Sequence, residues 1–187
     1  WKTKEGLVRG CSCRGTAGFA HVSCLAEQAK ILLAEAEENN LDLKVKDERW
    51  ERWETCSLCE QKYHGVVRGA LGWACWKTYL GRPETTAIRQ AAMCELGNGL
   101  ADAKCHEDAL SVKEARLSSM RRLGASEDRM LVAKSNLADT YAELGRSEEA
   151  MGLRRDVYSG YLKLCGNEQK GTLREAINYA TSLVILR

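Results

Sequence analysis

Cysteine and histidine side chains form three close pairs in the first third of this 187-residue chain. The pairs are Cys11-x-Cys13, His21-x-x-Cys24 and Cys56-x-x-Cys59. Each spacing lets two side chains reach one tetrahedral Zn²⁺ at about 2.0 to 2.3 Å. Buried apolar thiols are the alternative, but the glycine-rich segment around the first pairs offers them little core. Because we expect no secretory signal on this chain, the clustering predicts metal ligation rather than disulfides.

Two kinds of sequence must position these ligands. Residues 1–24 carry glycines at positions 6, 10, 15 and 18 with little apolar periodicity, which predicts loops that a metal would order. Residues 23–38 have the apolar periodicity of a helix that ends at Asn39-Asn40, and a charged stretch then leads to Trp50 and Trp53. One proline in the chain and many Ala, Leu, Glu and Arg residues predict a mainly α-helical protein.

Beyond Pro83 the chain repeats itself at an interval of about 42 residues. Glu107-Asp108-Ala109-Leu110 returns 41 residues later as Glu148-Glu149-Ala150-Met151. Asn136-Leu137-Ala138 returns 42 residues later as Asn178-Tyr179-Ala180. Self-similarity at this period predicts a solenoid of stacked helix hairpins.

One complete hairpin is predicted around a turn at Gly145-Arg146. Its facing apolar stripes are Leu137, Ala138, Tyr141, Ala142 and Leu144 before the turn, and Ala150, Leu153, Val157 and Leu164 after it. The motif from Asn136 to Ala150 resembles the tetratricopeptide repeats of the kinesin-light-chain type. The resemblance implies an α-helical solenoid over residues 83–187, with a degenerate first unit and a surface that binds a protein or peptide. An apolar stripe near the end of the chain, over residues 176–184, predicts that further repeats follow.

The N-terminal motifs resemble the RING-CH (variant RING) zinc finger. The residues that carry the resemblance are Cys11-Ser12-Cys13-Arg14-Gly15, Phe19 to Leu25, Trp53 and Cys56-Ser57-Leu58-Cys59. The resemblance implies a small zinc-stabilised finger over residues 1–64. The segment from Val66 to Leu80 is apolar on most sides, which predicts a buried connecting helix over residues 65–82. The complete domain would hold two zinc ions.

The family's alternating pairing implies which ligands share each zinc. Cys11, Cys13, Cys56 and Cys59 would form one full site. His21 and Cys24 would contribute to the other, whose first ligand pair we expect upstream of Trp1. His64 is a second candidate for a missing ligand.

The same resemblance implies a ubiquitin-protein ligase that acts by positioning, without a covalent intermediate or a catalytic residue of its own. Its partners would be a ubiquitin-conjugating enzyme and ubiquitin. Trp53 and Leu58 would contact the enzyme, and Lys62 is the candidate cation for ubiquitin. For Trp53 the alternative is packing against the finger's own helix.

Two alternatives stand beside this interpretation. A plant homeodomain finger has the same ligand order, but it usually places a Trp two residues before its last pair, whereas Trp53 lies three residues before Cys56. The other functional class is a zinc-stabilised adaptor that binds proteins and has no ligase activity.

Charge and hydropathy argue against some functions. With 28 Lys and Arg against 26 Asp and Glu, the net charge of +2 gives a weak field, so we expect no nucleic-acid partner. No run of about 18 apolar residues predicts a membrane span. We therefore expect a soluble, cytoplasmic protein.

Overall fold

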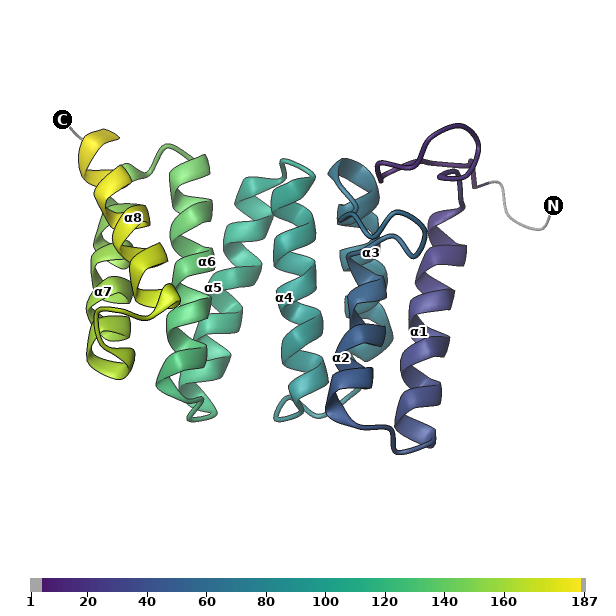
Figure 1. Cartoon of the computed structure of the whole chain (residues 1–187), viewed down its shortest axis with the longest axis horizontal. Coiled ribbons are helices and arrows are strands. Elements are labelled where there is room, and N and C mark those ends of the chain that lie inside the picture. Colours follow the sequence, from purple (N-terminus) through teal and green to yellow (C-terminus); the bar gives the residue numbers. More distant parts are fainter. Residues whose placement is uncertain (1–4, 186–187) are drawn as a thin grey trace. The chain divides into compact units, whose positions relative to one another are not determined.

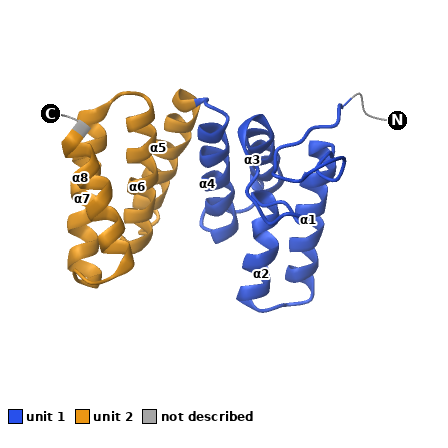
Figure 2. Cartoon of the chain, turned by 45° about the horizontal axis from the view of Figure 1, so that its top comes forward, with its two compact units in different colours: residues 1–105 blue, residues 106–187 orange. Residues whose placement is uncertain are grey.

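The computed structural model describes residues 5–185. Within that range the chain forms eight α-helices and one short 3₁₀ helix, and its only extended pairings are two isolated bridges, so the expected mainly α class is confirmed (Figure 1). No helix in the described part of the chain combines the length and the apolar character needed to cross a membrane. Two compact units divide between Cys105 and His106 (Figure 2).

The first unit holds four α-helices. They are α1 (Val22–Glu38), α2 (Leu43–Trp50), α3 (Gly65–Tyr79) and α4 (Ala87–Asp102), with the 3₁₀ helix η1 (Glu51–Trp53) after α2. α1 ends where the asparagine pair predicts, and Asn40 has a left-handed φ of 50°. A buried cluster joins the helices; it contains Ala29, Leu33, Trp53, Cys75, Tyr79 and Ala92.

Glycine lets α3 and α4 pack backbone to backbone. A Cβ atom added at Gly99 would lie 2.7 Å from the carbonyl oxygen of Arg68, and one added at Gly72 would lie 2.8 Å from that of Glu95. Larger side chains would therefore push the two helices apart. The expected connecting helix corresponds to α3, whose partner α4 belongs to the same unit. The expected domain boundaries at residues 64 and 82 both fall inside this first unit.

The second unit is a succession of antiparallel helices. They are α5 (His106–Arg122), α6 (Glu127–Glu143), α7 (Ser147–Cys165) and α8 (Lys170–Ile185). The predicted turn at Gly145 is present, and this glycine adopts a left-handed φ of 72°. Ala150 and Val157 are buried, as the facing stripe predicts. Leu164 is 47% exposed, so the prediction is wrong there: Leu164 lies in the last turn of α7, which ends one residue later.

A side-chain contact recurs in the second unit at the interval of the sequence repeat. Lys113 on α5 donates to the hydroxyl of Thr140 on α6 over 2.8 Å. Arg154 on α7 donates to the hydroxyl of Ser182 on α8 over 2.6 Å. These partners are offset by 41 and 42 residues, which is the interval found in the sequence. The chain thus repeats a polar contact between helices along with the helices themselves.

Candidate metal centre

Two loops at the same end of the first unit carry the cysteines, one before α1 and one before α3 (Figure 1). An antiparallel bridge between Val8 and Ala20 closes the first loop. The N–H of His64, on the second loop, donates to the carbonyl oxygen of Gly10 over 2.8 Å. A side chain at Gly10 would collide with Val67, because an added Cβ would lie 2.4 Å from the Val67 Cβ. Glycine is therefore needed where the first loop crosses the start of α3.

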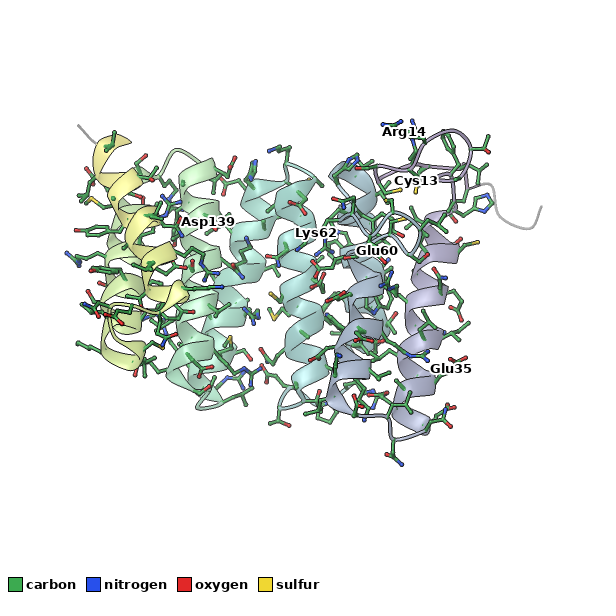
Figure 3. All side chains as sticks on the ribbon, viewed as in Figure 1. Cys13, Arg14, Glu35, Glu60, Lys62 and Asp139 are labelled. Carbon is green, nitrogen blue, oxygen red and sulfur yellow. The ribbon has the colours of Figure 1, made fainter. Side chains whose placement is uncertain are left out.

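The second loop is a tight turn around Cys56-x-x-Cys59. A bridge between Thr55 and Lys62 closes it, and the N–H of Cys56 donates to the carbonyl oxygen of Gln61 over 3.0 Å. The N–H of Glu60 returns to the carbonyl oxygen of Cys56 over 3.0 Å. In this turn Glu60 adopts a left-handed φ of 56°, a conformation that favours glycine. Figure 3 shows Glu60 and Lys62 on this loop and Cys13 on the first one.

The two loops bring four thiols together. The sulfur atoms of Cys11, Cys13, Cys56 and Cys59 all lie within 4.8 Å of one another. Those of Cys13 and Cys56 are 3.7 Å apart. Four sulfurs around one Zn²⁺ at about 2.3 Å would be separated by about 3.8 Å. The donor set and its spacing therefore fit a closed tetrahedral zinc site.

Local contacts give the thiols of this cluster different pKa values. At Cys56 burial opposes ionisation, but N–H groups of Cys59 and Leu58 and the neighbouring thiols outweigh it and lower the pKa to about 7. The N–H of Leu58 lies 3.5 Å from that sulfur. Burial and the adjacent sulfurs raise the pKa of Cys13 to about 12. One thiolate thus forms readily, and a bound cation would stabilise the others.

His21 and Cys24 lie together at the start of α1, with 3.8 Å between the His21 Nδ1 and the Cys24 sulfur. His21 is the N-cap residue, yet its side chain makes no capping hydrogen bond. The Glu5 carboxylate instead accepts from the N–H of Ser23 over 3.0 Å, which leaves the imidazole available as a ligand. Within residues 5–185 no third ligating side chain joins this pair, and His64 lies outside the four-cysteine cluster.

The three residues predicted to contact partners differ in how they are exposed and paired. Trp53 is 0% exposed and lies in a buried cluster with Ala29 and Leu33 of α1, as the packing alternative predicts, so its ring offers no docking surface. Leu58 is 68% exposed beside the cluster. Lys62 is also exposed, but its ammonium group pairs with Glu54 over 3.0 Å.

A buried arginine, which the sequence patterns do not predict, links this second loop to the helices. Arg68 on α3 is 2% exposed and bonds to Glu95 on α4 over 2.5 Å. The same guanidinium lies 3.5 Å from Glu54, the partner of Lys62. Both α3 and α4 look apolar in this region, so the pair could have been found only as two opposite charges on otherwise apolar helices.

Comparison with models of known protein families finds no family that matches the chain, and comparison with curated proteins finds no significant match. Any function assigned to the metal centre therefore depends on its residues and their geometry.

Proposed function

We propose that this chain is a zinc-binding ubiquitin-protein ligase of the RING-CH type. The finger would dock a ubiquitin-conjugating enzyme, and tetratricopeptide-like repeats in the second unit would recruit a protein substrate. The observation that carries the proposal is the meeting of Cys11, Cys13, Cys56 and Cys59 in one site, since these residues belong to the motif that resembles this finger.

Zinc has a structural role in this proposal. Four thiolates fill the coordination sphere and leave no position for a reactive water, so the ion orders the two loops. These loops hold few buried apolar side chains, which makes the ion a large part of their stability. His21 and Cys24 supply two of the four ligands that a second zinc would need.

Ligation would occur by proximity and orientation. The finger would hold the thioester between ubiquitin and its conjugating enzyme in a conformation open to a substrate lysine. Leu58 is the exposed apolar side chain nearest to the ligands in sequence, so we assign it the central docking contact. Trp53 would support this surface from the core rather than touch the enzyme.

The adaptor without ligase activity is favoured by one specific observation. Two of the three residues that the resemblance assigns to partner contacts are already engaged within the chain. Trp53 is buried, and Lys62 pairs with Glu54. In an adaptor, the zinc loops would only stabilise the first unit, and the helices would bind proteins.

The metal site is tested by native mass spectrometry of the zinc-loaded chain at neutral pH. We expect one zinc that a chelator removes and that Cys56→Ser abolishes. Cys165→Ser is the matched control, because Cys165 is exposed at the end of α7 and lies outside the cluster. A folded chain that binds no zinc would refute the site and the proposed ligase together.

Ligase activity is tested by the discharge of ubiquitin from a panel of charged conjugating enzymes onto free lysine. We expect the zinc-loaded chain to accelerate discharge and Leu58→Ala to slow it by about tenfold. Leu164→Ala is the matched control, since Leu164 is exposed on α7. If the zinc-loaded chain accelerates no enzyme of the panel, the adaptor is the better description.

A further inference from the structure

A groove of about 530 Å³ runs along the second unit, between α5 and α7. α6 forms its floor. Its apolar middle consists of Leu117, Leu137 and Leu153, one from each helix. The groove thus has an apolar centre and two charged ends, and the ends differ in the sign of their charge.

One end of the groove is acidic. Glu114 and Glu149 line it, with Tyr141 between them. The hydroxyl of Tyr141 donates to Glu114 over 2.7 Å, and the Arg146 guanidinium stacks on its ring at 4.5 Å from the centroid. Arg146 also pairs with Glu149, so this end is a connected and ordered set of polar groups.

The other end carries the cations that line the groove. Arg121 on α5 and Arg155 on α7 lie there together with Asp156, which also lines the groove and pairs with Arg155 over 3.4 Å, so Arg121 is the cation that this end offers. Arg121 follows Glu114 by seven residues on the same helix, which separates the two backbone positions by about 10.5 Å. The groove therefore presents carboxylates and a cation about 10 Å apart, with leucine side chains between them.

Gly152 lines the groove from the middle of α7. A glycine inside a helix costs about 0.5 to 1 kcal/mol relative to alanine. Packing does not require it, because a Cβ added there would meet no atom within 4 Å. Gly160, on the same helix, differs, because an added Cβ would lie 2.5 Å from the side chain of Leu131. Open space in front of Gly152 is what an occupant of the groove would use.

We propose that this groove binds an extended peptide segment of a partner protein that carries a basic, an apolar and an acidic side chain on one face. The basic side chain lies at Glu114, beside the Arg146–Glu149 pair, the apolar one against the partly exposed Leu153, and the acidic one at Arg121. Alternate side chains of an extended chain share a face, and five residues place the two charged ones about 13 Å apart, within reach of both ends. The inference rests on the recruiting role proposed for the second unit and specifies the chemistry of its ligand.

The test uses a fluorescently labelled peptide with lysine, leucine and glutamate at its first, third and fifth positions and serine between them. Its affinity for the full chain is measured by fluorescence polarisation. We expect binding that weakens by about tenfold when the glutamate is replaced by lysine, since a cation then faces Arg121. The Arg121→Glu variant should reverse this preference and bind the two-lysine peptide more tightly. Lys163→Glu is the matched control on α7, outside the groove, and should keep the original preference.

A second variant tests the open space in front of Gly152 on α7. Gly152→Leu should leave the helical circular dichroism unchanged, because leucine favours helices, and should weaken peptide binding by about tenfold or more. Absence of binding, equal binding of both peptides, or a preference that Arg121→Glu leaves unchanged would overturn the proposal. Concentration-dependent dimers that Gly152→Leu abolishes would also overturn it, because the occupant would then be a second copy of the chain. Neither zinc nor a conjugating enzyme takes part in this assay, so its failure is distinct from failure of the ligase activity.

Discussion

Glu60 holds the conformation that closes the second cysteine loop, although its side chain is unsuited to it. A left-handed φ costs an L-residue roughly 1 to 2 kcal/mol, and Glu60 adopts 56° directly after the last cysteine. The hydrogen bond from its N–H to Cys56 keeps it there. Backbone hydrogen bonding thus maintains the turn, although glutamate disfavours a left-handed φ.

We expect Glu60→Gly to stabilise the chain by about 1 kcal/mol, because glycine adopts this φ without steric cost. The measurement is the denaturation midpoint in urea, followed by tryptophan fluorescence. Asn40→Gly is the control, since Asn40 also has a positive φ, at the end of α1, but asparagine tolerates it better. A gain at Asn40 equal to or larger than that at Glu60 would contradict the explanation.

The lowered pKa of Cys56 predicts how metal binding depends on pH. A thiol whose folded pKa lies near 7, below its ordinary value, is ionised above that pH and is protonated as the pH falls through it. Because zinc binds thiolates, protons compete with it. We expect bound zinc to be retained at pH 8 and released progressively below pH 7, as measured with a zinc-sensitive dye. Retention that is independent of pH between 8 and 5 would contradict this account.

Between helices, glycine serves two opposite purposes in this chain. Gly99 brings α4 against the backbone of α3, whereas Gly152 leaves open space on α7. Their local sequences do not distinguish them, since each lies inside a helix. The difference arises from the neighbour that each glycine faces.

Alanine at these two positions should therefore have opposite effects on stability. We expect Gly99→Ala to destabilise the first unit by about 1 to 3 kcal/mol, because the added methyl group meets a carbonyl oxygen. Gly152→Ala should stabilise the second unit by about 0.5 to 1 kcal/mol, through helix propensity alone. Thermal unfolding followed by circular dichroism measures both. Changes of the same sign would show that the packing of α3 on α4 is not as described.

For the whole molecule, zinc is expected to matter to one unit and not to the other. All five tryptophans occur at or before residue 76, so tryptophan fluorescence reports on the first unit alone. Trp53 is among them; it precedes Cys56 by three residues, and its ring is buried in the core of this unit. The helices of the second unit contain none of the cysteines of the cluster.

A chelator should therefore shift the tryptophan emission to longer wavelength as the first unit loosens, while most of the helical circular dichroism remains. The reason is that the ion orders the two loops, whereas the second unit depends on packing between helices. Measuring both signals during one chelator titration checks this. Simultaneous loss of both signals would show that the two units unfold as one. An unchanged emission would show that the first unit is stable without metal.

What the sequence by itself determined was local. The spacing of the cysteine pairs and the 3.6-residue periodicity of α1 and α6 depend on residues a few positions apart, and the structure reproduces them. The repeat reappears as the contacts of Lys113 with Thr140 and of Arg154 with Ser182, because similar residues at intervals of 41 and 42 form similar contacts between helices.

Tertiary structure decided what depends on the approach of distant segments. It paired α3 with α4 through glycines that look unfavourable in a helix, and it buried Arg68 against Glu95 on helices that look apolar. It also enclosed Trp53, whose sequence position suits a surface as well as a core. Burial is set by which faces of separate helices meet, and that geometry is not contained in the spacing of residues along one helix.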